Sequence, residues 1–267
     1  MKPEQQQILI TGASGGIGSE TARLLSQSGA RILAVGRNKT ALERLLATLS
    51  PHPHQPHQYF CADLNEDSQR RQLLCDLEQQ GIKPNVLINL AGTNQLVLFD
   101  AQSESEIRRV IDTNLTATLL LTHAVLPVLK QHSNARIINV GSTLGSIGYP
   151  GYVSYCTSKF ALRGFTEALQ RELADGSIRV QYFAPRATRT GLNSEAADRL
   201  NSQLNNAVDS PEQVAQQLVA MLRSKASSRF LGWPEKLFVK LNALFPSIVS
   251  RAINKQLAVI KQQASAP

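Results

Sequence analysis

The stretch Thr11-Gly12-Ala13-Ser14-Gly15-Gly16-Ile17-Gly18 decides the fold of this chain. It joins a short aliphatic segment, residues 8–10, to an amphipathic segment, residues 18–26, so it lies between a predicted strand and a predicted helix. Glycines in such a turn let backbone N–H groups approach a phosphate, and the N-terminus of the helix favours negative charge. The stretch therefore predicts a cradle for a pyrophosphate.

Short aliphatic runs alternate with longer segments of helical periodicity along most of the chain. Strands this apolar, joined through helices, belong in a parallel sheet covered on both faces. We predict an α/β fold with a doubly wound, Rossmann-like sheet that binds its ligand outside the carboxyl ends of the strands. The expected strands are residues 8–10, 32–35, 59–62, 86–90, 136–140 and 179–183, and the expected helices are residues 18–26, 40–49, 68–79, 105–129, 152–174 and 211–223.

Composition excludes several classes of protein. Of the 267 residues, 42% are apolar and 18% are charged, which is typical of a globular domain and not of a collagen-like or disordered chain. Cys61, Cys75 and Cys156 are too scattered for a disulfide framework or a thiolate metal site, and they suit a reducing compartment. Neither a signal peptide nor a membrane-spanning run is recognisable, so we expect a cytoplasmic protein.

The positive charge is concentrated in the last part of the chain. Residues 221–267 hold eight lysines and arginines and one acid, Glu235, which gives +7 of the total of +8. A nucleic-acid binder usually spreads its basic residues over the fold that grips the duplex. We therefore expect no nucleic-acid partner.

Residues 51–57 contain three of the five histidines, interspersed with prolines. The cluster is either a metal site or a solvated connection between a helix and a strand. Because no carboxylate or thiolate lies beside the histidines, we predict a connection and no bound metal.

The residues after the second expected strand indicate the kind of dinucleotide. Most dinucleotide folds place an acid there for the ribose 2′-hydroxyl, but this chain has Gly36-Arg37-Asn38. Arginine offers a planar fork of donors that suits a phosphate, so Arg37 favours NADP over NAD. The alternative is a surface arginine without such a role.

Three further residues form a candidate catalytic group. The i, i+4 spacing puts Tyr155 and Lys159 on one face of the expected helix 152–174. A neighbouring ammonium favours a phenolate, so we expect Lys159 to lower the pKa of Tyr155. Ser142 follows the strand 136–140 at its carboxyl end, where its hydroxyl can hold a substrate carbonyl oxygen.

Together these motifs resemble the short-chain dehydrogenase/reductase family over about residues 7–231. The matching pieces are the turn at residues 11–18, Asp63-Leu64, Asn89-Leu90-Ala91-Gly92, Asn114, Ser142 and the Tyr-x-x-x-Lys of Tyr155 and Lys159. The resemblance implies an NADP(H)-dependent carbonyl reductase, or its reverse, that works as a homo-oligomer. A non-catalytic NADP-binding sensor or scaffold is the alternative.

The resemblance also implies roles for individual residues. Tyr155 would be the acid, Ser142 would polarise the substrate oxygen, and Asn114 and Lys159 would complete a proton relay. The implied cofactor contacts are Gly12, Ser14, Gly16, Ile17, Gly18, Arg37, Asp63, Leu64, Asn89, Ala91, Gly92, Tyr155, Lys159, Thr188 and Thr190.

Two departures from the family pattern stand out. Leu90 replaces an asparagine, which is a mild change, whereas Arg186 replaces the glycine after Pro185. A bulky cation there affects how Thr188 and Thr190 reach the cofactor. Arg186 and Arg189 either face an acidic group of the substrate or are solvated surface arginines.

We expect a boundary between a cofactor-binding domain, residues 1–231, and a basic amphipathic extension, residues 232–267. Leu237, Leu241, Leu244 and Ile248 recur at helical spacing, and the segment also carries Lys236 and Lys240. Such a helix either lies on an anionic membrane surface, inside the cell, or packs on its own domain or on a partner subunit. The substrate, expected to be apolar or lipid-like, would be bound by residues 188–206 and by this extension.

Overall fold

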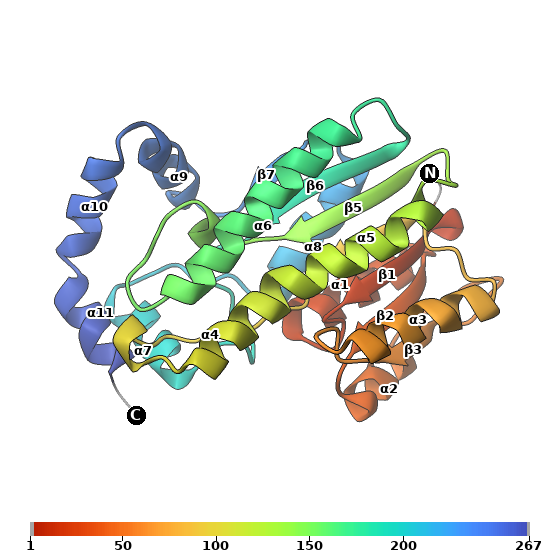
Figure 1. Cartoon of the computed structure of the whole chain (residues 1–267), viewed down its shortest axis with the longest axis horizontal. Helices are drawn as coiled ribbons and strands as arrows, with labels where there is room; N and C mark the ends of the chain where they lie inside the picture. Colours follow the sequence, from red (N-terminus) through yellow and green to blue (C-terminus); the bar gives the residue numbers. More distant parts are fainter. Residues whose placement is uncertain (1–2, 266–267) are drawn as a thin grey trace.

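Seven parallel strands form one sheet in the order β3-β2-β1-β4-β5-β6-β7 in the computed structural model, which describes residues 3–265 (Figure 1). The order reverses between β1 and β4, which is where a doubly wound sheet opens a crevice for its ligand. The predicted α/β fold is therefore confirmed. The strands are β1 Gln7–Thr11, β2 Arg31–Gly36, β3 Gln58–Cys61, β4 Val86–Asn89, β5 Ala135–Val140, β6 Ile178–Ala184 and β7 Ser228–Phe230.

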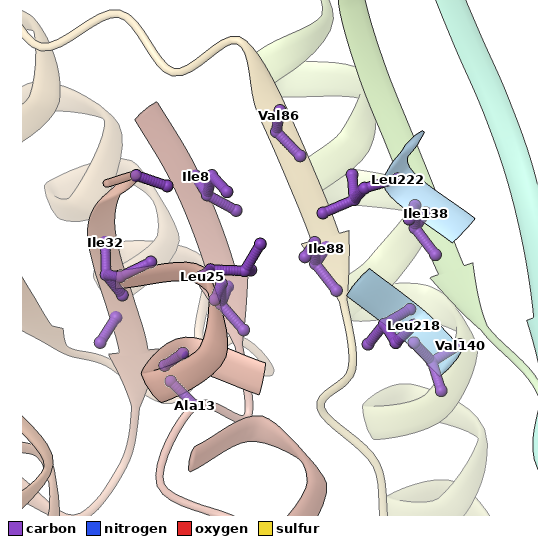
Figure 2. Close-up of a cluster of buried hydrophobic side chains, with 14 of the residues drawn as sticks. Ile8, Ala13, Leu25, Ile32, Val86, Ile88, Ile138, Val140, Leu218 and Leu222 are labelled. Carbon is purple, nitrogen blue, oxygen red and sulfur yellow. The ribbon is translucent and has the colours of Figure 1, made fainter. Parts of the chain in front are cut away.

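Two apolar layers hold the helices on the sheet, because alternate strand residues point to opposite faces. Ile8 and Ile10 of β1 pack with α1, α2 and α8, and Figure 2 shows Leu25, Leu218 and Leu222 against the strands on this side. Leu9 faces the other layer, which α3, α5 and α6 cover. The helices are α1 Gly16–Gln27, α2 Lys39–Ala47, α3 Asp67–Gln79, α4 Glu104–Ile111, α5 Ala117–Leu129, α6 Val153–Glu172, α7 Glu195–Gln203, α8 Pro211–Arg223, α9 Glu235–Leu244, α10 Pro246–Asn254 and α11 Leu257–Ala264.

The helix expected over residues 105–129 is interrupted. The π-helical turn η3, Asp112–Thr116, separates α4 from α5. A π turn inserts one extra residue into the helical ladder, and such turns often occur at functional sites. Asn114 lies in the middle of this turn and is fully buried.

The strand β7 and the helix α7 were not expected from the sequence. β7 has only three residues, and α7 lies in the stretch that the sequence analysis left without secondary structure. Ser194 caps α7 by accepting a hydrogen bond from the N–H of Ala197 at 3.2 Å. The cap and the buried residues Ala196 and Leu200 explain why the stretch forms a helix.

The extension forms three helices, α9, α10 and α11, and not one continuous helix. Pro246 has no N–H to continue α9 and suits the first position of α10. α11 lies against α7 (Figure 1), where Ile260 and Ala264 join a cluster with Leu96, Tyr152 and Leu200. In residues 3–265 no helix is long and apolar enough to cross a membrane.

The histidines of residues 51–57 serve the connection itself. His57 accepts a hydrogen bond from the N–H of Ile32 at 3.0 Å, and His52 accepts one from the N–H of Gln55 at 3.0 Å. Burial lowers the pKa of His57. Within the described part of the chain we find no cluster of side chains able to hold a metal ion.

Candidate active site

One cavity of about 970 Å³ lies at the carboxyl ends of the strands. Segments that follow β1, β2, β3, β4, β5 and β6 all contribute to its wall, as expected for a ligand site in a doubly wound sheet. The predicted site residues that line it are Gly12, Ser14, Gly16, Ile17, Arg37, Asp63, Leu64, Ala91, Gly92, Ser142, Tyr155, Lys159, Thr188 and Thr190.

The glycine-rich turn packs its backbone closely against itself and against the segment after β4. Gly12 has a φ of +65°, and a Cβ there would lie 2.8 Å from the Cα of Ala91. A Cβ on Gly18 would lie 2.3 Å from the carbonyl oxygen of Gly12. Because no side chain among the described residues caps α1 at Gly15, the first N–H groups of this helix remain available at the cavity.

Ser142 and Tyr155 both line the cavity. Burial raises the pKa of Tyr155 to about 12, and the hydroxyl of Ser142 opposes that shift. Burial also lowers the pKa of Lys159 to about 8, while its Nζ donates to the carbonyl oxygen of Val140 at 3.0 Å. The Lys159 Nζ lies 5.8 Å from the centre of the Tyr155 ring.

The expectation that Lys159 lowers the pKa of Tyr155 is therefore wrong for this structure. The cost of burying a charge acts on both groups, and it disfavours the phenolate and the ammonium alike. The i, i+4 spacing put the two side chains on one face of α6, but spacing says nothing about burial.

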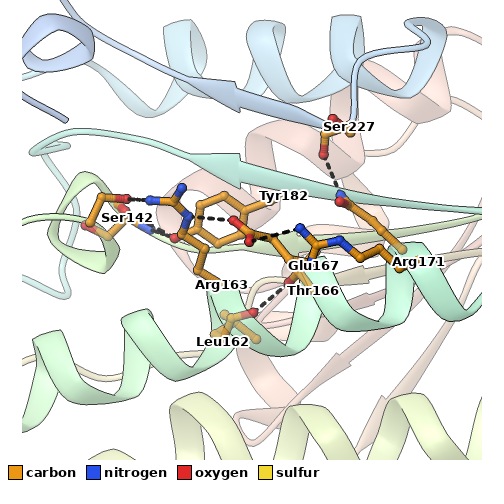
Figure 3. Close-up of polar contacts among 10 residues, drawn as sticks. Ser142, Leu162, Arg163, Thr166, Glu167, Arg171, Tyr182 and Ser227 are labelled. Carbon is orange, nitrogen blue, oxygen red and sulfur yellow. Dashed lines mark hydrogen bonds and ion pairs between the residues drawn. The ribbon is translucent and has the colours of Figure 1, made fainter. Parts of the chain in front are cut away.

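A contact with strand β6 holds the backbone of Ser142 in place. The hydroxyl of the buried Tyr182, on β6, lies 3.3 Å from the carbonyl oxygen of Ser142 and 3.4 Å from its nitrogen (Figure 3). A Cβ on Gly141 would lie 2.1 Å from that hydroxyl, so only glycine fits beside it. On α6, Arg163 donates to Ser146 at 2.6 Å and pairs with Glu167 at 2.9 Å, which ties the helix to the loop after Ser142.

Asn114 lies behind the cavity and is not part of its lining. Its side-chain nitrogen donates to Thr93 O and to Ser158 Oγ, both at 3.0 Å, and its Oδ1 accepts from the N–H of Thr93 at 2.7 Å. A Cβ on Gly92 would lie 3.2 Å from Asn114 Oδ1 and 3.8 Å from Lys159 Nζ. The structure thus places Asn114 and Lys159 on the same side of Gly92.

Two predicted cofactor residues also lie outside the cavity lining. Gly18 packs against the turn, as described above. Asn89 is buried and donates to Thr122 Oγ1 at 3.0 Å and to Asn139 Oδ1 at 2.8 Å, which links β4 to α5 and β5. Asn89 therefore supports the segment after β4 that lines the cavity, and does not line the cavity itself.

Arg37 and Asp63 lie together at one end of the cavity. Arg37 Nη1 is 3.9 Å from Asp63 Oδ2, and the two side chains are 68% and 33% exposed. This pair is loose and solvated, so its contribution to stability is small. The guanidinium is free to contact a ligand at this end.

Arg186 lines the cavity and is not a solvated surface arginine. It is only 17% exposed, and it pairs with Asp209 at 2.7 Å and with Glu235 at 3.3 Å. The hydrogen bond with Asp209 raises the pKa of Arg186. Arg189, by contrast, is exposed.

Sequence reasoning missed several residues of the cavity wall. Asn94, Tyr149 and Tyr152 line it, although no motif pointed to them. Phe238 of α9 and Ile253 of α10 also line it, and they belong to the extension that was expected to bind the substrate. The apolar helical spacing of the extension was a signal for burial, but nothing in it indicated where that face would pack.

Comparisons with known proteins agree with this geometry. The model of the short chain dehydrogenase family matches residues 6–201. A 3-oxoacyl-(acyl-carrier-protein) reductase of Thermotoga maritima is 30% identical over 237 residues, which cover 87% of this chain and 96% of the relative. Carbonyl reductase family member 4 of Danio rerio is 31% identical over 81% of this chain and 90% of its own. A crystal structure of a short-chain dehydrogenase from Streptomyces avermitilis has the same fold, with a TM-score of 0.79, 23% identity and coverage of 97% of this chain and 98% of that one.

Proposed function

Because this chain belongs to the short-chain dehydrogenase family of oxidoreductases, we propose that it moves a hydride between NADP(H) and the carbonyl or alcohol carbon of an apolar, lipid-like substrate. One observation carries the proposal. Ser142, Tyr155 and Lys159 line the same cavity as the glycine-rich turn at residues 11–18. A proton donor, a hydroxyl and a phosphate cradle are the parts that such a reaction requires.

The residues present fit a dinucleotide. Side chains at Gly12 and Gly18 would collide with backbone, so the turn keeps a backbone cradle at the start of α1. Arg37 lies at one end of the same cavity and Lys159 lines it too. When bound, NADPH supplies the hydride.

Tyr155 acts as the acid in the direction of reduction. With a pKa of about 12, its phenol stays protonated at neutral pH and can give its proton to the substrate oxygen. Ser142 Oγ donates a hydrogen bond to the same oxygen and stabilises the charge that develops there. Lys159, with Asn114 nearby, supports the return of a proton to Tyr155.

The first test is Tyr155→Phe. We expect NADPH binding within about twofold of the wild type and a fall in turnover of at least about 10²-fold, the range for loss of a general acid. Tyr59→Phe, on β3 and outside the cavity, is the matched control and should keep full activity. An active Tyr155→Phe variant would refute the assignment.

Arg37 carries the preference for NADP. Hydrogen bonds to charged groups contribute about 1.5–3 kcal/mol, and the 68% exposure of Arg37 argues for the lower end of that range. NADPH should therefore bind about tenfold more tightly than NADH. Arg37→Asp should reverse the order, and Arg44→Asp, on the exposed side of α2, should not. Equal dissociation constants for the two cofactors in the wild type would contradict this part of the proposal.

The cavity supports an apolar substrate. Leu144, Ile147, Leu200, Phe238 and Val249 line it. The Thermotoga relative is named for the reduction of 3-oxoacyl groups, which also carry an alkyl chain. Ketones, aldehydes and 3-oxoacyl thioesters of increasing chain length, screened by the oxidation of NADPH, test the substrate class. If NADPH binds but no carbonyl in the screen is reduced, the sensor or scaffold alternative is favoured.

We further propose peripheral contact with an anionic membrane surface from the cytoplasmic side. Trp233, Leu244, Phe245 and Ile248 are 71%, 72%, 55% and 51% exposed, and the same segment carries the basic residues Lys236 and Lys240 of α9 and Arg251 of α10. Exposed apolar side chains among basic ones suit a lipid interface. The protein should sediment with anionic vesicles at low salt and not at high salt. A protein that stays in the supernatant at low salt contradicts this proposal.

A homo-oligomer, either a dimer or a tetramer, is the expected assembly. Leu120 of α5 and Val153 and Phe160 of α6 are 44%, 44% and 43% exposed, which leaves apolar side chains on these two helices uncovered. Analytical ultracentrifugation tests the proposal. Phe160→Asp should shift the sedimentation coefficient toward that of a monomer, and a wild type that sediments as a monomer contradicts it.

A further inference from the structure

Arg186 is the point where three segments of the chain meet. It follows Pro185 at the end of β6, and its guanidinium reaches Asp209, before α8, and Glu235, the first residue of α9. Asp209 is tied to the same segment through its backbone, because its N–H donates to Ala187 O at 2.9 Å and its carbonyl accepts from Arg189 N at 3.0 Å. The arginine therefore joins the strand that ends at the cavity to the extension.

The ion pairs are well enclosed. The side chains of Arg186, Asp209 and Glu235 are 17%, 16% and 26% exposed. At this exposure water screens the charges less than at the surface. Removing the arginine would leave two weakly solvated carboxylates without a partner, which destabilises the contact between the segments. The planar fork of arginine can bind both carboxylates at once, which the single ammonium of lysine cannot do with the same geometry.

The entry to the extension is shaped around this arginine. Gly232 has a φ of +88°, and a Cβ there would lie 2.4 Å from Glu235 Oε2 and 2.7 Å from Arg186 Cδ. Only glycine fits such a turn beside the ion pairs. The chain leaving β7 is thereby directed along the rim of the cavity, where Pro234 and Glu235 form part of the wall.

The extension supplies an apolar part of that wall. Phe238 of α9 and Val249 and Ile253 of α10 line the cavity that Ser142 and Tyr155 also line. Further contacts hold these helices over it, because Asn242 donates to Ser146 O at 2.9 Å and Tyr149 donates to Gln256 at 3.4 Å. All three lining residues lie beyond residue 201, where the family match ends.

We propose that Arg186 is a positioning residue that docks α9 and α10 onto the catalytic cavity, so that the extension forms the binding surface for the apolar chain of the substrate. The inference rests on the proposed reductase function for the identity of the substrate, but the docking itself does not. The hydrogen bonds of the Arg186 side chain go to Asp209 and Glu235 and not to Ser142 or Tyr155, so its loss should affect the binding of long substrates and not the chemical step.

The docking is tested by hydrogen exchange, with no substrate present. In Arg186→Gly, which restores the family residue, amide exchange of residues 235–256 should rise at least about tenfold, while exchange of β1 and α1 stays unchanged. Glu235→Gln, which keeps the shape of the side chain, should give a smaller rise in the same segment. Arg171→Ala removes an exposed pair with Glu167 and is the matched control that should change neither region.

Kinetics with NADPH then test the substrate surface. For a long-chain ketone, Arg186→Gly should raise KM at least about tenfold with kcat within about twofold, and a short aldehyde should be unaffected. Arg186→Lys should restore part of the loss. The Kd of NADPH, measured by fluorescence, separates an effect on the cofactor from an effect on the substrate surface.

The outcomes separate the two proposals. Unchanged exchange of residues 235–256 in both variants would overturn the docking role, whatever the activity. Raised exchange with equal KM for long and short substrates would overturn the role in substrate binding. An absence of turnover in the wild type, with raised exchange in the variants, would overturn the reductase function and leave the docking intact.

Discussion

Ile260→Ala tests whether the extension is an integral part of the fold. Ile260 lies on α11 with none of its surface exposed, in a cluster with Leu96, Tyr152 and Leu200. The substitution removes three carbon atoms from a site where neighbours on three other segments, the loop after β4, the start of α6 and α7, cannot easily close the space.

The expected cost follows from that burial. A buried isoleucine cut to alanine costs about 2–5 kcal/mol, which includes the lost transfer energy and the cavity left behind. Alanine favours a helix slightly more than isoleucine does, which offsets a few tenths of a kcal/mol. We expect a net loss of about 3 kcal/mol, or a fall in Tm of about 6–12 °C for a domain of this size.

Thermal unfolding followed by circular dichroism, with and without NADPH, measures the effect. The matched control is Ile248→Ala on α10, which removes the same atoms from a side chain that is 51% exposed and should cost less than about 1 kcal/mol. If Ile260→Ala and Ile248→Ala have the same Tm as the wild type, α11 is not packed on the domain. In that case the argument for a docked extension fails.

Three further results are expected. Gly18→Ala places a Cβ 2.3 Å from the carbonyl oxygen of Gly12, so the turn must deform and NADPH binding, measured by fluorescence, should be lost; binding equal to the wild type would contradict the cradle. The pKa of Lys159 is lowered to about 8, so its charged form is present below that pH and lost above it. The value of kcat/KM for reduction should therefore fall above pH 8, and Lys159→Arg should extend its plateau to higher pH. Asn114→Ala leaves the half-buried N–H of Thr93 without its acceptor at 2.7 Å, which should cost about 1–3 kcal/mol in urea unfolding. A variant as stable as the wild type would show that water replaces the amide.

The sequence determined the features that depend on neighbours in the chain. The glycine-rich turn, the strand and helix periods and the i, i+4 pair of Tyr155 and Lys159 each obey a local steric or geometric rule, so they could be recognised without coordinates. Eleven of the twelve expected elements needed changes of at most two residues at either end, and α8 at Pro211–Arg223 needed none. The apolar spacing of residues 105–129 predicted one helix, although the structure divides this stretch with the π turn around Asn114.

Only the tertiary structure decided the rest. Arg186 meets Asp209 and Glu235, which are 23 and 49 residues away, and no period in the sequence links such distant positions. The extension packs on α7 because Ile260 and Ala264 find apolar partners there, and its amphipathic pattern fits a membrane, a partner or its own domain equally well. The pKa of Tyr155 rises because of burial, and burial is a property of everything that surrounds a side chain, far from it in the sequence as well as near.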